Sequence, residues 1–153
     1  MSFKPSLVVK ATLLALVFAV AMAGSALAYV HFGTLTGVLA GKKFNGTFSN
    51  GDTKRPWAGV IELTLQDPGG TKVGSFCTDI HRTTSKNVKY ALSDEPVSCE
   101  ILYLLSTYPP EKTGLTNTQG AMRQAAVWHF SDQFDVNPTL HPTLAAQTQA
   151  LID

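Results

Sequence analysis

Two cysteines give this 153-residue chain its clearest capacity for covalent chemistry. A thiolate is a strong nucleophile, and Cys77 stands in the run Phe-Cys-Thr-Asp at 76–79. If 76–81 is extended, the side chains of Cys77, Asp79 and His81 project to one side, because successive residues of a strand alternate. That spacing would bring a carboxylate and an imidazole to the same side as a thiol.

Gln124 lies in a segment with the pattern of a helix, predicted over 118–130. Positions three and four apart share a helix face, so Gln124 forms one stripe with Ala121, Ala125 and Trp128. We expect this stripe to face inward, where an amide without hydrogen-bond partners costs about 1–3 kcal/mol. Two interpretations stay open: Gln124 caps a strand end by hydrogen bonds, or its side-chain carbonyl is bonded to another group.

These residues resemble the Cys-Gln thioester domain, or TQxA domain, of Gram-positive surface proteins. Phe-Cys-Thr-Asp at 76–79 is similar to the family's cysteine motif on a strand, and Gln-Ala-Ala-Val-Trp-His-Phe at 124–130 is similar to its glutamine motif on a helix. The resemblance covers about residues 34–153. It implies an internal thioester between the Cys77 sulfur and the Gln124 carbonyl, formed with loss of ammonia.

The resemblance also implies a function. An amine on a target protein or small molecule would attack the Gln124 carbonyl and release Cys77, leaving an isopeptide bond without enzymatic turnover or a cofactor. Phe76 and Trp128 are candidates to shield the thioester from water. His129 is a candidate to accept the amine's proton and Asp79 to orient the amine, and each is also interpretable as a hydrogen-bonded structural residue.

Three features depart from the family. Thr-Gln-Gly-Ala at 118–121 also matches T-Q-x-A, which makes Gln119 an alternative glutamine, but Met122 and Arg123 follow it in place of an aliphatic residue and Trp. Arg123 precedes Gln124 where the family often has a hydrophobic residue or threonine. The stalk domains and wall anchor usual in the family are not in the sequence, so we expect a C-terminally truncated or freely secreted version.

Three other chemistries use the same residues. A disulfide between Cys77 and Cys99 would stabilise a non-covalent binding module, although Cys99 lies in an apolar helical run where a cysteine acts as a small core residue. A secreted cysteine hydrolase would use Cys77 with one histidine and one aspartate; the candidates are His129, His81, Asp132 and Asp79. A metal site is not expected, because no two of the four histidines have the i, i+4 spacing typical of a helical zinc site.

The elements that must position these residues change character along the chain. Residues 29–92 predict strands, with alternation in 60–66 and a turn at Asp67-Pro68-Gly69-Gly70 that leads into a partner strand over 72–80. Residues 95–153 predict helices at 98–105, 118–130 and from Pro142 onward. Strands followed by helices indicate an α+β fold, with a β-sandwich or barrel-like sheet and a helical subdomain.

Composition narrows the class of protein. Twelve basic and eleven acidic residues give a net charge of +1, which argues against a nucleic-acid binder. Residues 1–28 have the pattern of a signal peptide, with Lys4 and Lys10 before an apolar run and Ala26-Leu27-Ala28 at the cleavage site. We therefore expect a secreted or cell-surface domain over 29–153 that meets a membrane only through its signal peptide.

Overall fold

The computed structural model describes residues 32–91, 96–110 and 113–153. The predicted signal peptide, 1–28, lies outside these described residues. The strands are β1 (Phe32–Lys43), β2 (Gly46–Phe48), β3 (Thr53–Lys54), β4 (Trp57–Leu65), β5 (Lys72–Ser75), β6 (Lys89–Ala91) and β7 (Phe134–Val136). The helices are α2 (Cys99–Thr107), α3 (Asn117–Asp132) and α4 (Pro142–Ile152).

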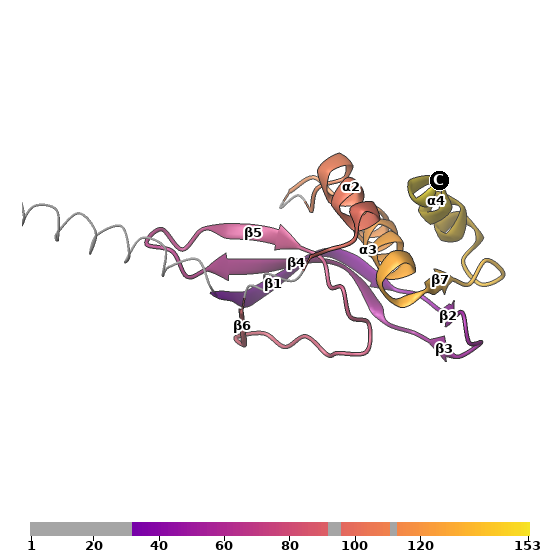
Figure 1. Cartoon of the computed structure of the whole chain (residues 1–153), viewed down its shortest axis with the longest axis horizontal. Helices are drawn as coiled ribbons and strands as arrows, with labels where there is room; N and C mark the ends of the chain where they lie inside the picture. The colour runs from indigo at the N-terminus through magenta and orange to yellow at the C-terminus, as the bar shows by residue number, and fades with distance from the viewer. Residues whose placement is uncertain (1–31, 92–95, 111–112) are drawn as a thin grey trace, which may run out of the picture.

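The described strands form two antiparallel sheets, and the predicted α+β class is confirmed. The larger sheet has the order β5-β4-β1-β6 and the smaller one the order β3-β2-β7 (Figure 1). The hairpin predicted around Asp67–Gly70 is present, because β4 and β5 pair on either side of it. The described strands do not close into a barrel.

The helical half of the chain is tied to the strand half by β7. This short strand follows α3 and pairs with β2, with Thr47 opposite Asp135. Gln133 makes the connection by ending α3 in the left-handed conformation, at a φ of 53°. The helical subdomain expected over 95–153 therefore also contains a strand, which joins the smaller sheet.

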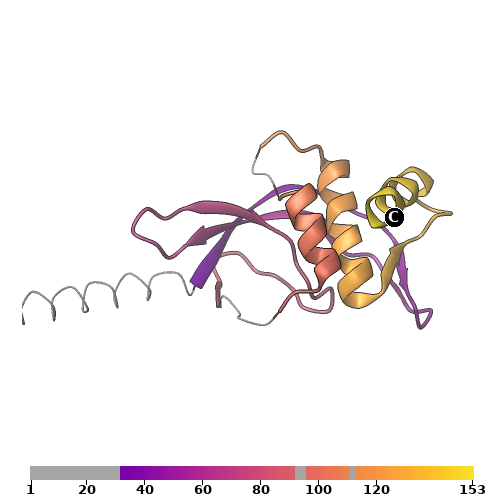
Figure 2. The same cartoon turned by 45° about the horizontal axis from the view of Figure 1, so that its top comes forward.

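Helix α3 is the central element, packed against β1 and β4 on one side and against α2 and α4 on others. Figure 2 shows α2 and α3 side by side, with α4 near β7 at the far end. Gly120 permits the close approach of α3 to the sheet, because a Cβ there would collide with the Ala40 carbonyl oxygen. Within the described ranges, no helix is long and apolar enough to cross a membrane.

The segment after β5 crosses the larger sheet, because β5 and β6 are the two opposite edge strands. It begins at Phe76 and ends against β1, where Asn87 and Val88 form backbone hydrogen bonds with Leu35. We call residues 76–88 the crossover segment. The predicted strand over 72–80 is thus only half right, since regular pairing stops at Ser75.

Candidate functional site

The side-chain amide of Gln124 is hydrogen-bonded to both backbone polar groups of Cys77. The Cys77 N–H donates to Gln124 Oε1 at 2.8 Å, and Gln124 Nε2 donates to the Cys77 carbonyl oxygen at 2.7 Å. These two residues are 47 positions apart in the sequence. We call this pair of hydrogen bonds the amide clamp; it holds the Gln124 carbonyl beside the backbone of the residue that carries the thiol.

The buried stripe on α3 is present as predicted. Gln124 is 1% exposed, and Ala121, Ala125 and Trp128 are also buried. The clamp satisfies the buried amide and removes the cost of leaving it without partners. The structure therefore shows the hydrogen bonds of the first interpretation, which Gln124 makes to the backbone of Cys77 just beyond the end of β5.

The Cys77 thiol is half-buried, and its Sγ donates to the Asp79 carbonyl oxygen at 3.1 Å. Burial has the largest effect and raises the pKa of this thiol above its ordinary value. The hydrogen bond to the Asp79 backbone has the next largest effect and lowers the pKa, and the carboxylates of Asp79 and Asp132 raise it by smaller amounts. A raised pKa keeps the sulfur protonated at neutral pH. The group is thus a thiol in a sheltered environment and not a free thiolate.

The expected extended arrangement of 76–81 is wrong. Cys77 lies in irregular backbone just beyond β5. The Asp79 carboxylate accepts a hydrogen bond from the His81 backbone N–H at 2.9 Å and pairs with Arg82 at 3.0 Å. Within the described residues, the only hydrogen bond that links the thiol to Asp79 goes to the backbone of that residue.

Two cavities meet at Cys77. The smaller, of about 340 Å³, contains Gln124 and Trp128 in its lining, and the larger, of about 560 Å³, contains Phe76 and Asp79. The residues common to both linings come from β4 and the crossover segment: Ile61, Cys77, Arg82, Thr83 and Thr84.

The two predicted shielding residues have different positions. Trp128 is 3% exposed, packs with Phe134 in the core beside Cys77, and lines the smaller cavity with Gln124. Phe76 packs instead against the core cluster of α2 and α3. Trp128, together with Trp57 of β4, shares a cavity wall with both Cys77 and Gln124.

The candidate histidines His129 and His81 line neither of these cavities and make other contacts. The His129 Nδ1 is 2.7 Å from Asp135 Oδ1 on β7, and His81 stacks on Phe48 with ring centroids 5.1 Å apart. Among the described residues, no histidine lines either cavity that contains Cys77. The structure thus does not bring the predicted proton acceptor, His129, to the thiol.

Gln119 has a structural position. It is residue N3 of α3, where its side chain accepts from the backbone N–H of Thr116 at 2.8 Å and Thr116 Oγ1 accepts from the Gln119 N–H at 3.2 Å. This reciprocal pair is a capping box, which stabilises the start of a helix. The exposed amide of Gln119 is thus engaged in capping, in contrast to the buried amide of Gln124.

Cys99 is not the core residue expected from its apolar neighbours. It is exposed at the first position of α2 and lines a surface groove with the end of α4. Cys77 and Cys99 are both free thiols in the structure. The helix does bury Ile101 and Leu104, so the prediction of a core-facing helix is confirmed. The prediction that Cys99 belongs to the core is wrong.

One supporting residue could not be predicted. Lys54 on β3 donates from Nζ to the Ile80 carbonyl oxygen at 2.6 Å, and it also lines the smaller cavity. This contact holds the turn that follows Cys77. In the sequence, Lys54 adjoins Arg55 in what reads as an ordinary charged turn, and the pattern contains no signal for this role.

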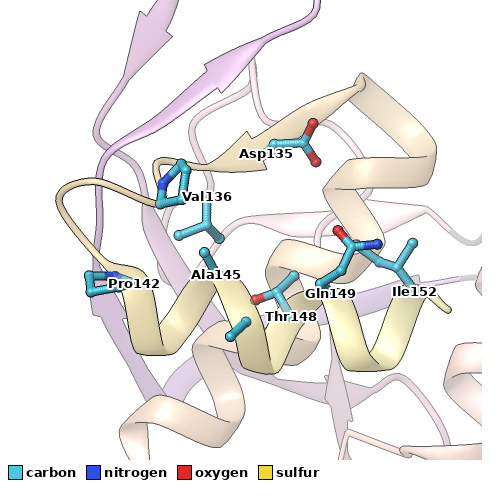
Figure 3. A pocket seen from close by; sticks show the side chains of 9 residues that line it. Asp135, Val136, Pro142, Ala145, Thr148, Gln149 and Ile152 are labelled. Carbon is cyan, nitrogen blue, oxygen red and sulfur yellow. The ribbon is translucent and has the colours of Figure 1, made fainter.

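Another cavity, of about 470 Å³, lies between β7 and α4 and is shown in Figure 3. Asp135 stands on its β7 side, and Thr148 and Gln149 stand on its α4 side. None of the predicted site residues lines it. In the described part of the chain, no group of three or more histidine, cysteine, aspartate or glutamate residues is arranged to hold a metal ion.

No family model, curated protein or solved structure matches this chain. The resemblance to thioester domains therefore depends on the two sequence motifs.

Proposed function

We propose that this domain captures amines covalently through an internal thioester between Cys77 Sγ and the Gln124 side-chain carbonyl carbon. The observation that carries the proposal is the amide clamp, with its hydrogen bonds of 2.8 and 2.7 Å. A thioester between two residues so distant in sequence requires the fold to hold them together. The amide clamp supports the proposal because it joins Cys77 and Gln124, the two residues that the sequence motifs indicate.

The hydrogen bond from the Cys77 N–H also favours the chemistry. It lies on Gln124 Oε1, the oxygen that gains negative charge when a nucleophile attacks the carbonyl. Backbone N–H groups at this position stabilise such a charge, as in the oxyanion holes of acyl-transfer enzymes. The same donor would serve both thioester formation and capture of the amine.

The surroundings support a protected but reachable bond. Gln124 is almost fully buried, whereas Cys77 is half-buried and lines two cavities. Burial limits hydrolysis, and the cavities give a small amine or a lysine side chain a route to the carbonyl. Each molecule reacts once, so the domain is an adhesin and not an enzyme, acting as a secreted or cell-surface protein.

Intact mass spectrometry of the mature, unreduced protein tests this function. The thioester predicts the loss of one ammonia, abolished by Cys77→Ala and by Gln124→Ala. The matched controls are Cys99→Ala and Gln119→Ala, which remove the second cysteine and the capping glutamine and should keep the loss. A disulfide would instead lose two hydrogens and survive Gln124→Ala. An unshifted mass in the folded protein would refute the thioester.

A further inference from the structure

We infer that the amide clamp accepts only an unsubstituted amide, so that capture of an alkyl amine releases the clamp and opens the crossover segment at Cys77. This inference rests on the proposed thioester. The backbone N–H and carbonyl of Cys77 would thus bind a primary amide at Gln124 and not a secondary amide. The evidence is the hydrogen-bond geometry of Gln124 and the stereochemistry of secondary amides.

The amide hydrogen that reaches the Cys77 carbonyl is identified by the geometry. Gln124 uses its Oε1 and its Nε2 toward the backbone of one residue, at 2.8 and 2.7 Å. A planar primary amide can do this only with the hydrogen on the same side of the C–N bond as its oxygen, because that N–H and the C=O both project toward the same neighbour. The other hydrogen points away from Cys77.

The two covalent steps balance without any added oxidant or reductant. In thioester formation, the Sγ–C bond forms, the C–Nε2 bond breaks, and the thiol proton leaves with the nitrogen as ammonia. In capture, the amine nitrogen bonds to the same carbon, the C–Sγ bond breaks, and one amine proton passes to the sulfur. Cys77 becomes a thiol again, and Gln124 carries a secondary amide when the amine is a lysine or methylamine.

The secondary amide does not fit the clamp. Its stable trans form places the alkyl carbon on the same side as the oxygen, in the position of the clamped hydrogen. With nitrogen kept 2.7 Å from the Cys77 oxygen, a carbon bonded at about 1.46 Å would stand only about 1.2 Å from that oxygen. Carbon–oxygen contacts in proteins are about 3.3 Å or longer, and the cis form is rare outside proline bonds.

The part of the structure that must move is the crossover segment, which lines both cavities. Cys77, Arg82, Thr83 and Thr84 belong to both linings, and Arg82 is 86% exposed at its side chain. Displacing Cys77 from Gln124 therefore joins the two cavities and makes room for the chain attached to the captured amine. Helix α3 need not move, because it is fixed by its packing on β1 and β4.

Ammonia and methylamine provide a matched pair of probes. Both react with a thioester and release Cys77, but ammonia restores the primary amide of Gln124, whereas methylamine leaves one methyl group in the clamp. The Cys99→Ala variant is used so that Cys77 is the one thiol available to a labelling reagent. Each adduct is first verified by intact mass, and its Cys77 is then labelled with iodoacetamide.

We expect Cys77 of the methylamine adduct to react about 10- to 100-fold faster than Cys77 of the ammonia adduct, since two hydrogen bonds are lost. Amide hydrogen exchange should accelerate across 76–84 and stay unchanged in α3, which distinguishes local opening from unfolding. Equal labelling and equal exchange in the two verified adducts would overturn the inference and leave the proposed function standing. Absence of any methylamine adduct would overturn both.

Discussion

Replacing Gln124 by a glutamate tests the amide clamp as a source of stability, separately from any covalent bond. The test is made in a Cys77→Ala background, which removes the thiol and keeps the backbone groups at position 77. The introduced carboxyl retains an oxygen to accept from the backbone N–H at position 77. Its other oxygen takes the place of Nε2, which lies 2.7 Å from the backbone carbonyl oxygen at that position, and two acceptors then face each other.

The expected penalty follows from burial and pH. An ionised carboxylate in this 1% exposed position leaves a buried charge and a carbonyl without its donor, a cost of about 3–5 kcal/mol. A protonated carboxyl avoids most of this, because its O–H donates to the carbonyl. The pKa of the introduced carboxyl is thus raised in the folded state above its unfolded value of about 4.3.

The sign of the pH dependence is then fixed. Stability of the variant is close to that of its parent below about pH 4.3, where the carboxyl is protonated in both states, and falls as the pH rises toward the folded pKa. Each pH unit costs about 1.4 kcal/mol over that interval. Urea unfolding of the Cys77→Ala parent and its Gln124→Glu derivative at about pH 4, 5, 6 and 7 measures the difference. A penalty that is small or independent of pH would refute the clamp.

Three further predictions concern the same region. In the ammonia adduct, which keeps the primary amide of Gln124 and a free Cys77, iodoacetamide should label the exposed Cys99 rapidly and Cys77 slowly near neutral pH, with the Cys77 rate rising at alkaline pH because burial raises its pKa. This adduct should also lose stability as the pH rises through the Cys77 pKa, and equal labelling rates of the two cysteines would contradict the burial. Gln119→Ala should destabilise the domain by about 0.5–1.5 kcal/mol in thermal unfolding, because it removes the side-chain half of the capping box, the hydrogen bond from the Thr116 N–H; a larger loss would show another role. Gly120→Ala should lower the stability by about 1–3 kcal/mol, since its Cβ meets the Ala40 carbonyl; an unchanged melting temperature would contradict this packing.

The parts of the site that could be predicted are those set by local periodicity. One helix face was predicted from residue spacing alone, and the structure buries all of it. Its residues are Ala121, Gln124, Ala125 and Trp128. Asp67–Gly70 marked a turn, and β5 returned beside β4 toward Cys77. These features depend on residues close together in the chain, which is why a single sequence contains them.

The parts that could not be predicted depend on contacts distant in sequence. The β7 strand has three residues, too few for a pattern, and exists through its pairing with β2. The alternation of residues in 76–81 is typical of a strand, but the backbone at Cys77 lies outside the sheet and forms hydrogen bonds with Gln124. Cys99 shares the apolar run of α2 but occupies its exposed first turn, so composition alone assigned it to the core incorrectly.

Peptide mapping of the unreduced mature protein tests the central claim most directly. Free thiols are first blocked at mildly acidic pH, and the protein is then cleaved with a lysine-specific protease under conditions that preserve a thioester. Cleavage after Lys72, Lys86 and Lys112 gives peptides 73–86 and 113–153, in which Gln124 is not the N-terminal residue and its own α-amine cannot attack the thioester. We predict one species that contains both peptides, with a mass equal to the sum of the two unmodified peptides less one ammonia. Recovery of the two peptides separately, with Cys77 blocked and Gln124 unmodified, would contradict the thioester.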